Sequence, residues 1–129
     1  MALAWLLYEL AKNPHIQERM RADVQSSFSD DEELTSEKLE KMQYMKNVIK
    51  ESLRLHSPGY LTNRMAISDV EIGGYLVPGG TVIILPMDAI QHSSHYWSNP
   101  KMFDPERFNE KGGWLDKLLS LRPELNANK

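Results

Sequence analysis

Glu51 and Arg54 are the two residues of this chain whose types and spacing most directly suggest an interaction. A carboxylate and a guanidinium three positions apart on a helix can touch and form an ion pair. The simplest interpretation is an exposed surface pair, which stabilises a helix by about 0.2–0.5 kcal/mol. Helical periodicity favours that interpretation, because Glu51 only borders the apolar face of its segment and Arg54 lies outside it.

His92 and His95 are the other pair with possible chemistry, since two imidazoles could bind a metal ion. A three-residue spacing without further ligands is weak support, and we interpret both as solvated loop histidines. The chain has no cysteine, which excludes a disulfide framework, a zinc–thiolate site and a cysteine nucleophile. We therefore predict no metal site, and we assign no catalytic residue in this chain.

Helices are expected to carry most of these residues. Leucines recur at helical spacing until Asn13, and Pro14 suits the first turn of a second helix running towards Ser26. Thr35 is the expected N-cap of a short helix over 36–42. A stronger amphipathic helix over 45–55 carries the Glu51 and Arg54 pair.

Short β-type segments follow this helix at 69–72, 75–77 and 81–85, separated by Gly-rich turns. Consecutive strands with tight turns predict a small antiparallel meander. After Pro86 a helical turn or two is expected to reach His92, and the remaining chain is expected to be irregular. The predicted fold class is mainly α with a small antiparallel β-sheet (α+β).

Composition sets limits on function. The length of 129 residues suits one domain at most, and a net charge of −3 without a basic patch argues against nucleic acid. The apolar stretch at the N-terminus is shorter than the ~20 residues of a membrane span and lacks the basic start of a signal peptide. No membrane segment is predicted in this chain, and the acidic cluster at 30–33 is interpreted as a solvated loop.

Several segments in order resemble the cytochrome P-450 superfamily, the heme-thiolate monooxygenases. They are WLLYELAKNP at 5–14, KESLRLH at 50–56, GYLVPGGT at 74–81, YW at 96–97, NP at 99–100 and FDPERF at 103–108. The resemblance predicts a partial cytochrome P-450 domain over 1–110. Residues 111–129 resemble nothing in the family and are predicted to be a divergent tail.

The resemblance implies roles for eight residues. Glu51, Arg54 and Arg107 would form a structural charge cluster, in which guanidinium forks hold a buried carboxylate in fixed geometry. Arg64 would bind a heme propionate. The expected substrate contacts are Gly59, Tyr60, Leu61 and Thr62, in the stretch that passes over the heme in this family.

The chain departs from the family in having no cysteine to bind the heme iron. Heme would be the cofactor of the complete domain, and we do not expect this chain to bind it stably. The complete protein would hydroxylate an apolar small molecule, with molecular oxygen and electrons from a reductase. The sequence leaves the location of this chain open, and the resemblance implies the endoplasmic reticulum membrane for a full-length relative. Two alternatives stay open: a segment of such an enzyme, inactive as it stands, or a non-catalytic isoform that acts only through protein binding.

Overall fold

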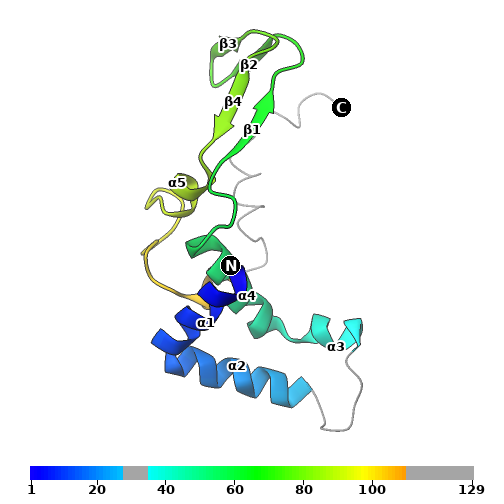
Figure 1. The fold of residues 1–129 in the computed structure, drawn as a ribbon, viewed down its shortest axis with the longest axis vertical. Helices are drawn as coiled ribbons and strands as arrows, with labels where there is room; N and C mark the ends of the chain where they lie inside the picture. Colours follow the sequence, from blue (N-terminus) through cyan, green and yellow to red (C-terminus); the bar gives the residue numbers. More distant parts are fainter. Residues whose placement is uncertain (28–34, 110–129) are drawn as a thin grey trace. The chain divides into compact units, whose positions relative to one another are not determined.

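The computed structural model describes residues 1–27 and 35–109 (Figure 1). These residues form two compact units, one of residues 1–27, 35–53 and 103–109 and the other of residues 54–102. The acidic segment at 30–33 and the predicted tail at 111–129 lie outside the described residues. No helix in the described ranges is long and apolar enough to cross a membrane.

Helices make up most of the first unit, as the apolar spacing predicts. They are α1 (Ala2–Lys12), α2 (Pro14–Ser27), α3 (Ser36–Lys41) and α4 (Gln43–Leu55), whose last two residues belong to the second unit. Pro14 is the first residue of α2. The first turn of a helix suits proline, because the N–H that proline lacks would have no partner within the helix there. Thr35 caps α3 as expected, because its hydroxyl accepts from the Lys38 backbone N–H at 3.4 Å.

The α4 helix is capped from another helix. The Asp23 carboxylate of α2 accepts a hydrogen bond from the Met45 backbone N–H, in the first turn of α4, at 3.0 Å. A carboxylate there satisfies an otherwise unpaired amide and complements the positive end of the helix dipole. The contact therefore fixes the beginning of α4 against α2.

The apolar core of the first unit includes side chains from the helices and from the segment 103–108. Its buried members are Leu10, Ile16, Met42, Tyr44, Val48, Phe103 and Phe108. The segment ends in a single 3₁₀ turn, η1 (Pro105–Phe108), whose N-cap is Asp104. The two phenylalanines therefore anchor a largely irregular segment by burial of apolar surface.

Two antiparallel strand pairs and one short helix form the second unit. The strands are β1 (Thr62–Met65), β2 (Val70–Ile72), β3 (Tyr75–Val77) and β4 (Val82–Leu85), followed by α5 (Met87–Gln91). A hairpin joins β2 to β3 through Gly73 and Gly74, both at positive φ, where glycine is tolerated without strain. The predicted helix after Pro86 is confirmed, with His92 as its C-cap.

The predicted meander is wrong in its strand order. Strand β4 pairs with β1, with Thr62 opposite Leu85 and Met65 opposite Val82, and not with β3. Beyond the ladder, Ala66 donates to the Thr81 carbonyl at 3.0 Å and accepts from Gly80 at 2.7 Å. The fold class itself is confirmed: helices predominate, and the strands are few, short and antiparallel.

Candidate functional site

Glu51 is a fully buried carboxylate on α4, with 0% of its surface exposed. Arg54, one turn later on the same helix, is 3% exposed. The interpretation of these residues as an exposed surface pair is therefore wrong. Helical periodicity failed because it marks only apolar faces, whereas these polar side chains are buried by segments that lie far away in the sequence.

The Glu51 carboxylate holds the irregular segment at two points. Its Oε1 accepts from the Arg107 Nε and from the Asp104 backbone N–H, both at 3.0 Å. Only 7% of the Arg107 side chain is exposed, so this is a buried ion pair. One contact fixes a side chain and the other fixes the backbone, and together they set the position of η1 on α4.

The Arg54 guanidinium binds backbone carbonyls within the second unit. Its Nη1 donates to the Gln91 carbonyl at 2.7 Å, and its Nη2 lies 3.4 Å from the Met102 carbonyl. The same group lies 5.1 Å from the centre of the Trp97 ring, a cation–π distance. Arg54 thus fastens the two ends of the segment 91–102, which has little regular structure. The structure pairs Glu51 with Arg107. The convergence of Glu51, Arg54 and Arg107 into one cluster stays a prediction.

Asn47 is a site residue that the sequence analysis missed. It is 0% exposed, lies one turn before Glu51 on the same face of α4, and donates from its Nδ2 to the Asn109 Oδ1 at 2.6 Å. Gln43, one turn earlier again, donates to the Asn47 Oδ1 at 2.9 Å. The spacing of these polar residues at i, i+4 and i+8 was the available signal for a buried polar face.

Tyr44 and Arg19 form a second contact to η1. The Arg19 guanidinium stacks 4.2 Å from the centre of the Tyr44 ring and pairs with the Glu106 carboxylate. Burial raises the pKa of Tyr44 above its ordinary value of 10.0, and nearby Glu106 and Asp104 act in the same direction, while Arg19 opposes them. Residues from α2, α4 and η1 therefore meet at this ring.

Arg64 lies on β1 and is exposed. Its Nη1 donates to the Asn63 carbonyl at 2.7 Å and to the Thr62 Oγ1 at 3.3 Å. Thr62 and Arg64 share one face of the strand pair with their partners Leu85 and Ile83, because alternate residues of a strand point the same way. Arg64 is thus on the same face as Thr62, and its role in binding a heme propionate stays a prediction.

The predicted substrate contacts before β1 are open to solvent. Tyr60 is 65% exposed and Leu61 is 54% exposed, and a Cβ atom placed at Gly59 would have no atom of the described residues within 4 Å. The Tyr60 carbonyl accepts from the Asp88 backbone N–H at 3.1 Å, which ties this stretch to α5. Their role as substrate contacts stays a prediction.

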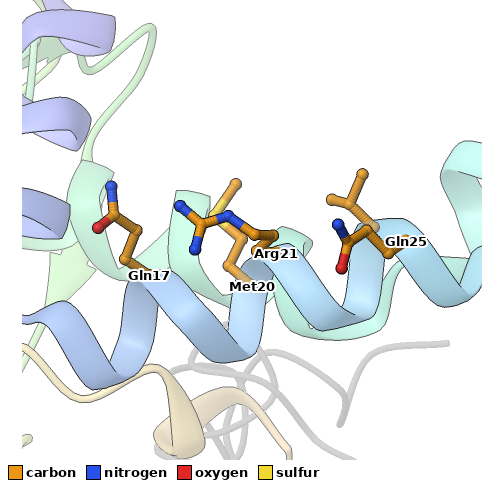
Figure 2. Close-up of a pocket in the computed structure, with 5 residues that line it drawn as sticks. Gln17, Met20, Arg21 and Gln25 are labelled. Carbon is orange, nitrogen blue, oxygen red and sulfur yellow. The ribbon is translucent and has the colours of Figure 1, made fainter.

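Two shallow depressions occur in the first unit. One, of about 230 Å³, runs along a single helix and is lined by Gln17, Met20, Arg21, Val24 and Gln25 (Figure 2). Among the described residues its lining comes from α2 alone, so it is a surface feature of that helix. The other, of similar volume, is a mostly apolar groove lined by Ala2, Leu3 and Leu6 of α1 and Ile49, Ser52 and Leu53 of α4.

Comparison with known proteins gives a consistent result. The cytochrome P450 family model matches residues 1–123. Tabersonine 3-oxygenase of Catharanthus roseus is 36% identical over 109 residues, which cover 84% of this chain and 22% of that protein. Cytochrome P450 3A18 of Rattus norvegicus is 32% identical over 93% of this chain and 24% of its own length. Ferruginol synthase of Salvia miltiorrhiza is 39% identical over 83% of this chain and 22% of its own length.

This chain belongs to the cytochrome P450 family, as the ordered motifs predicted. It spans about a fifth to a quarter of the length of these relatives. The family match extends past residue 110, to residue 123, and the predicted boundary at 110 stays a prediction.

Heme is the cofactor of the complete domain in this family, and the residues of this chain fit it only in part. The exposed Arg64 guanidinium suits a propionate carboxylate, because within the described residues its Nε and Nη2 make no hydrogen bond. An iron–thiolate bond does not fit, because the 129 residues include no cysteine. Within the described ranges, no three His, Asp or Glu residues are grouped to hold a metal ion.

Proposed function

We propose that this chain is the part of a heme monooxygenase that positions the segment 103–109 and lines one side of the heme and substrate site. The complete protein would hydroxylate an apolar small molecule with molecular oxygen and with electrons from a reductase, at the endoplasmic reticulum membrane. The observation that carries the proposal is the buried Glu51 carboxylate, which holds Arg107 and Asp104 in a chain of this family. Heme, when bound, supplies the oxygen chemistry.

Under this proposal the chain's own residues act by binding and positioning. Arg64 pairs with a propionate, and the stretch from Gly59 to Thr62 contacts the substrate with exposed tyrosine and leucine side chains. Glu51, Arg54 and Arg107 keep the irregular segments in place without touching the substrate. Because the 129 residues contain no cysteine, we propose that they are inactive by themselves.

A chimera tests the proposal. Residues 1–109 of this chain would replace the matching segment of tabersonine 3-oxygenase, which is 36% identical to it. We expect the chimera to give a thiolate-type heme spectrum with carbon monoxide and to oxygenate tabersonine. Glu51→Ala in the chimera should abolish heme retention, whereas Glu71→Ala, at an exposed strand position, should not.

The outcome that contradicts the proposal is a chimera with native helical content, by circular dichroism, that retains no heme. If the chimera does not fold, a smaller graft of residues 43–56 and 103–109 carries the same test. Leu61→Ala in a folded, active graft of 1–109 should change the product ratio if this stretch contacts the substrate.

A further inference from the structure

Four side chains form a continuous hydrogen-bonded chain from α4 to η1. Gln43 donates to Asn47 at 2.9 Å, and Asn47 donates to Asn109 at 2.6 Å. Asn109 then donates from its Nδ2 to the Glu106 Oε2. The Glu106 carboxylate, on its other oxygen, accepts from Arg19 of α2. We call the four residues Gln43, Asn47, Asn109 and Glu106 the amide relay.

The amide relay has a fixed direction. A carboxylate only accepts hydrogen bonds, so Glu106 requires the NH₂ group of Asn109, and the Asn109 oxygen is then left to face Asn47. Asn47 must in turn donate, which leaves its own oxygen for Gln43. One charged acceptor at the end thereby sets the orientation of both asparagine amides.

Burial makes this relay specific for one register of the segment. Asn47 is 0% exposed, and a buried amide without partners is costly, so both of its groups must be satisfied. A slip of the segment by one residue would place Phe108 opposite Asn47 and leave the amide unpaired. The relay is also separate from the ion pair, because it shares no side chain with Glu51 or Arg107.

We propose that the amide relay is a second fastening, which positions the end of the segment 103–109 through side chains other than those of the Glu51–Arg107 ion pair. Asn47 and Asn109 are positioning residues that select the register in which Arg107 reaches Glu51. The inference concerns positioning alone, so it stands whether or not the complete protein oxygenates a substrate.

Asn109→Asp provides the test, because Asn109 is exposed and its substitution should not unfold the chain. The carboxylate introduced at position 109 can still accept from Asn47, but it faces the Glu106 carboxylate without a proton to donate and breaks the relay. Glu106→Gln in the same chain should restore it, since the new amide can donate to that carboxylate and still accept from Arg19. Asn63→Asp, at an exposed asparagine of β1, is the matched control.

Backbone amide exchange in the full 129-residue chain is the measurement. We expect exchange at position 109, corrected for intrinsic rates, to rise about fivefold to tenfold in Asn109→Asp, the size of one hydrogen bond. Exchange at Asp104, which reports on Glu51, should rise less. Adding Glu106→Gln should return the rate at position 109 to within about twofold of the original.

Side-chain NMR gives an independent readout that a general loss of stability would not reproduce. In the unsubstituted chain the Asn47 NH₂ signals should be protected from exchange and well dispersed. Unprotected Asn47 signals, an Asn109→Asp effect no larger than that of Asn63→Asp, or failure of Glu106→Gln to restore the rate at position 109 would each overturn the proposal.

Discussion

A carboxylate that has no exposed surface is unstable unless other groups replace the water it has lost, and Glu51 shows how this chain meets that demand. A guanidinium N–H and a backbone N–H both converge on one oxygen at 3.0 Å. A buried pair of this kind gives little net stability, because desolvation offsets most of the attraction. Its effect is to specify position: the carboxylate accepts only where donors are correctly placed.

Removing one partner should therefore be far more harmful than the net value of the pair suggests. Arg107→Ala is expected to lower the free energy of unfolding by about 3–5 kcal/mol, because it leaves a buried charge short of a donor. Urea unfolding followed by circular dichroism measures the change. Arg21→Ala, which removes an exposed pair with Glu18, should cost no more than about 1 kcal/mol. Equal effects of the two substitutions would show that burial of the Glu51 pair has no energetic consequence.

Tyr44 gives a pH-dependent prediction. Its pKa is raised above 10.0 in the folded chain, chiefly by burial, so the folded state holds the phenolic proton more tightly than the unfolded state does. The resulting stabilisation is complete below the unfolded-state pKa of 10.0 and is lost as pH rises through the folded-state pKa. Tyr44→Phe should reduce the loss of stability that occurs as pH rises above 10.0, whereas Tyr75→Phe, at an exposed position, should leave that loss unchanged. Urea unfolding of both variants at several alkaline pH values measures this difference. An equal loss of stability in the two variants would contradict the prediction.

At the scale of elements, α4 depends on its neighbours for its ends. Its first turn is capped by Asp23 of α2 at 3.0 Å, and no capping residue precedes it in the sequence. A helix with such a borrowed cap has its beginning fixed by tertiary structure. The position of Glu51 and Asn47 along the helix axis is thereby tied to α2.

Asp23→Ala should lower the free energy of unfolding by about 0.5–2 kcal/mol, the usual effect of losing an N-cap. Thermal unfolding measured by circular dichroism tests this. Asp23→Asn should recover most of the loss, because the amide oxygen can still accept from Met45. A Glu18→Ala control on the exposed face of α2 should have a smaller effect. If Asp23→Ala behaves like the control, the contact does not stabilise α4.

Helices were predictable from the sequence because their signals are local. The apolar spacing, Pro14 and the Thr35 cap each act within a few residues, and the observed bounds agree with them closely. The pairing of β1 with β4 could not be predicted from the sequence, because Thr62–Met65 has no apolar alternation and its partner strand is distant in the sequence. Local turn signals favoured β3 with β4, and the long-range pairing prevailed.

The contacts of the candidate site also fall into two groups, those that the sequence predicted and those that it did not. Motif resemblance brought Glu51 and Arg107 together across 56 positions, a pairing that no local rule predicts. Asn47 was missed because an asparagine on a helix is ordinarily exposed, and its partner Asn109 lies 62 positions away. The spacing of Gln43, Asn47 and Glu51 marks one polar face of the helix, but sequence patterns alone do not say which distant segment buries that face.

At the scale of the whole chain, the absence of cysteine gives the clearest prediction. Reconstitution of the 129 residues with heme, followed by reduction and carbon monoxide, should give no thiolate-type spectrum, because no sulfur ligand of that kind exists. A complete relative such as ferruginol synthase is the positive control. A clear thiolate-type band from this chain would overturn both the prediction and the proposed inactivity.

The borrowed cap of α4 also implies an order of events during synthesis on the ribosome. The Asp23 contact closes over 22 residues, whereas Asn47 and Asn109 must meet across 62. Closing the longer loop costs roughly 0.9 kcal/mol more chain entropy, and its last residues leave the ribosome long after α2 and α4. We expect α4 to dock on α2 first, so that the polar face of α4 is already in position. The segment 103–109 would bind after that, and both the Glu51–Arg107 ion pair and the amide relay would form on a surface that already exists.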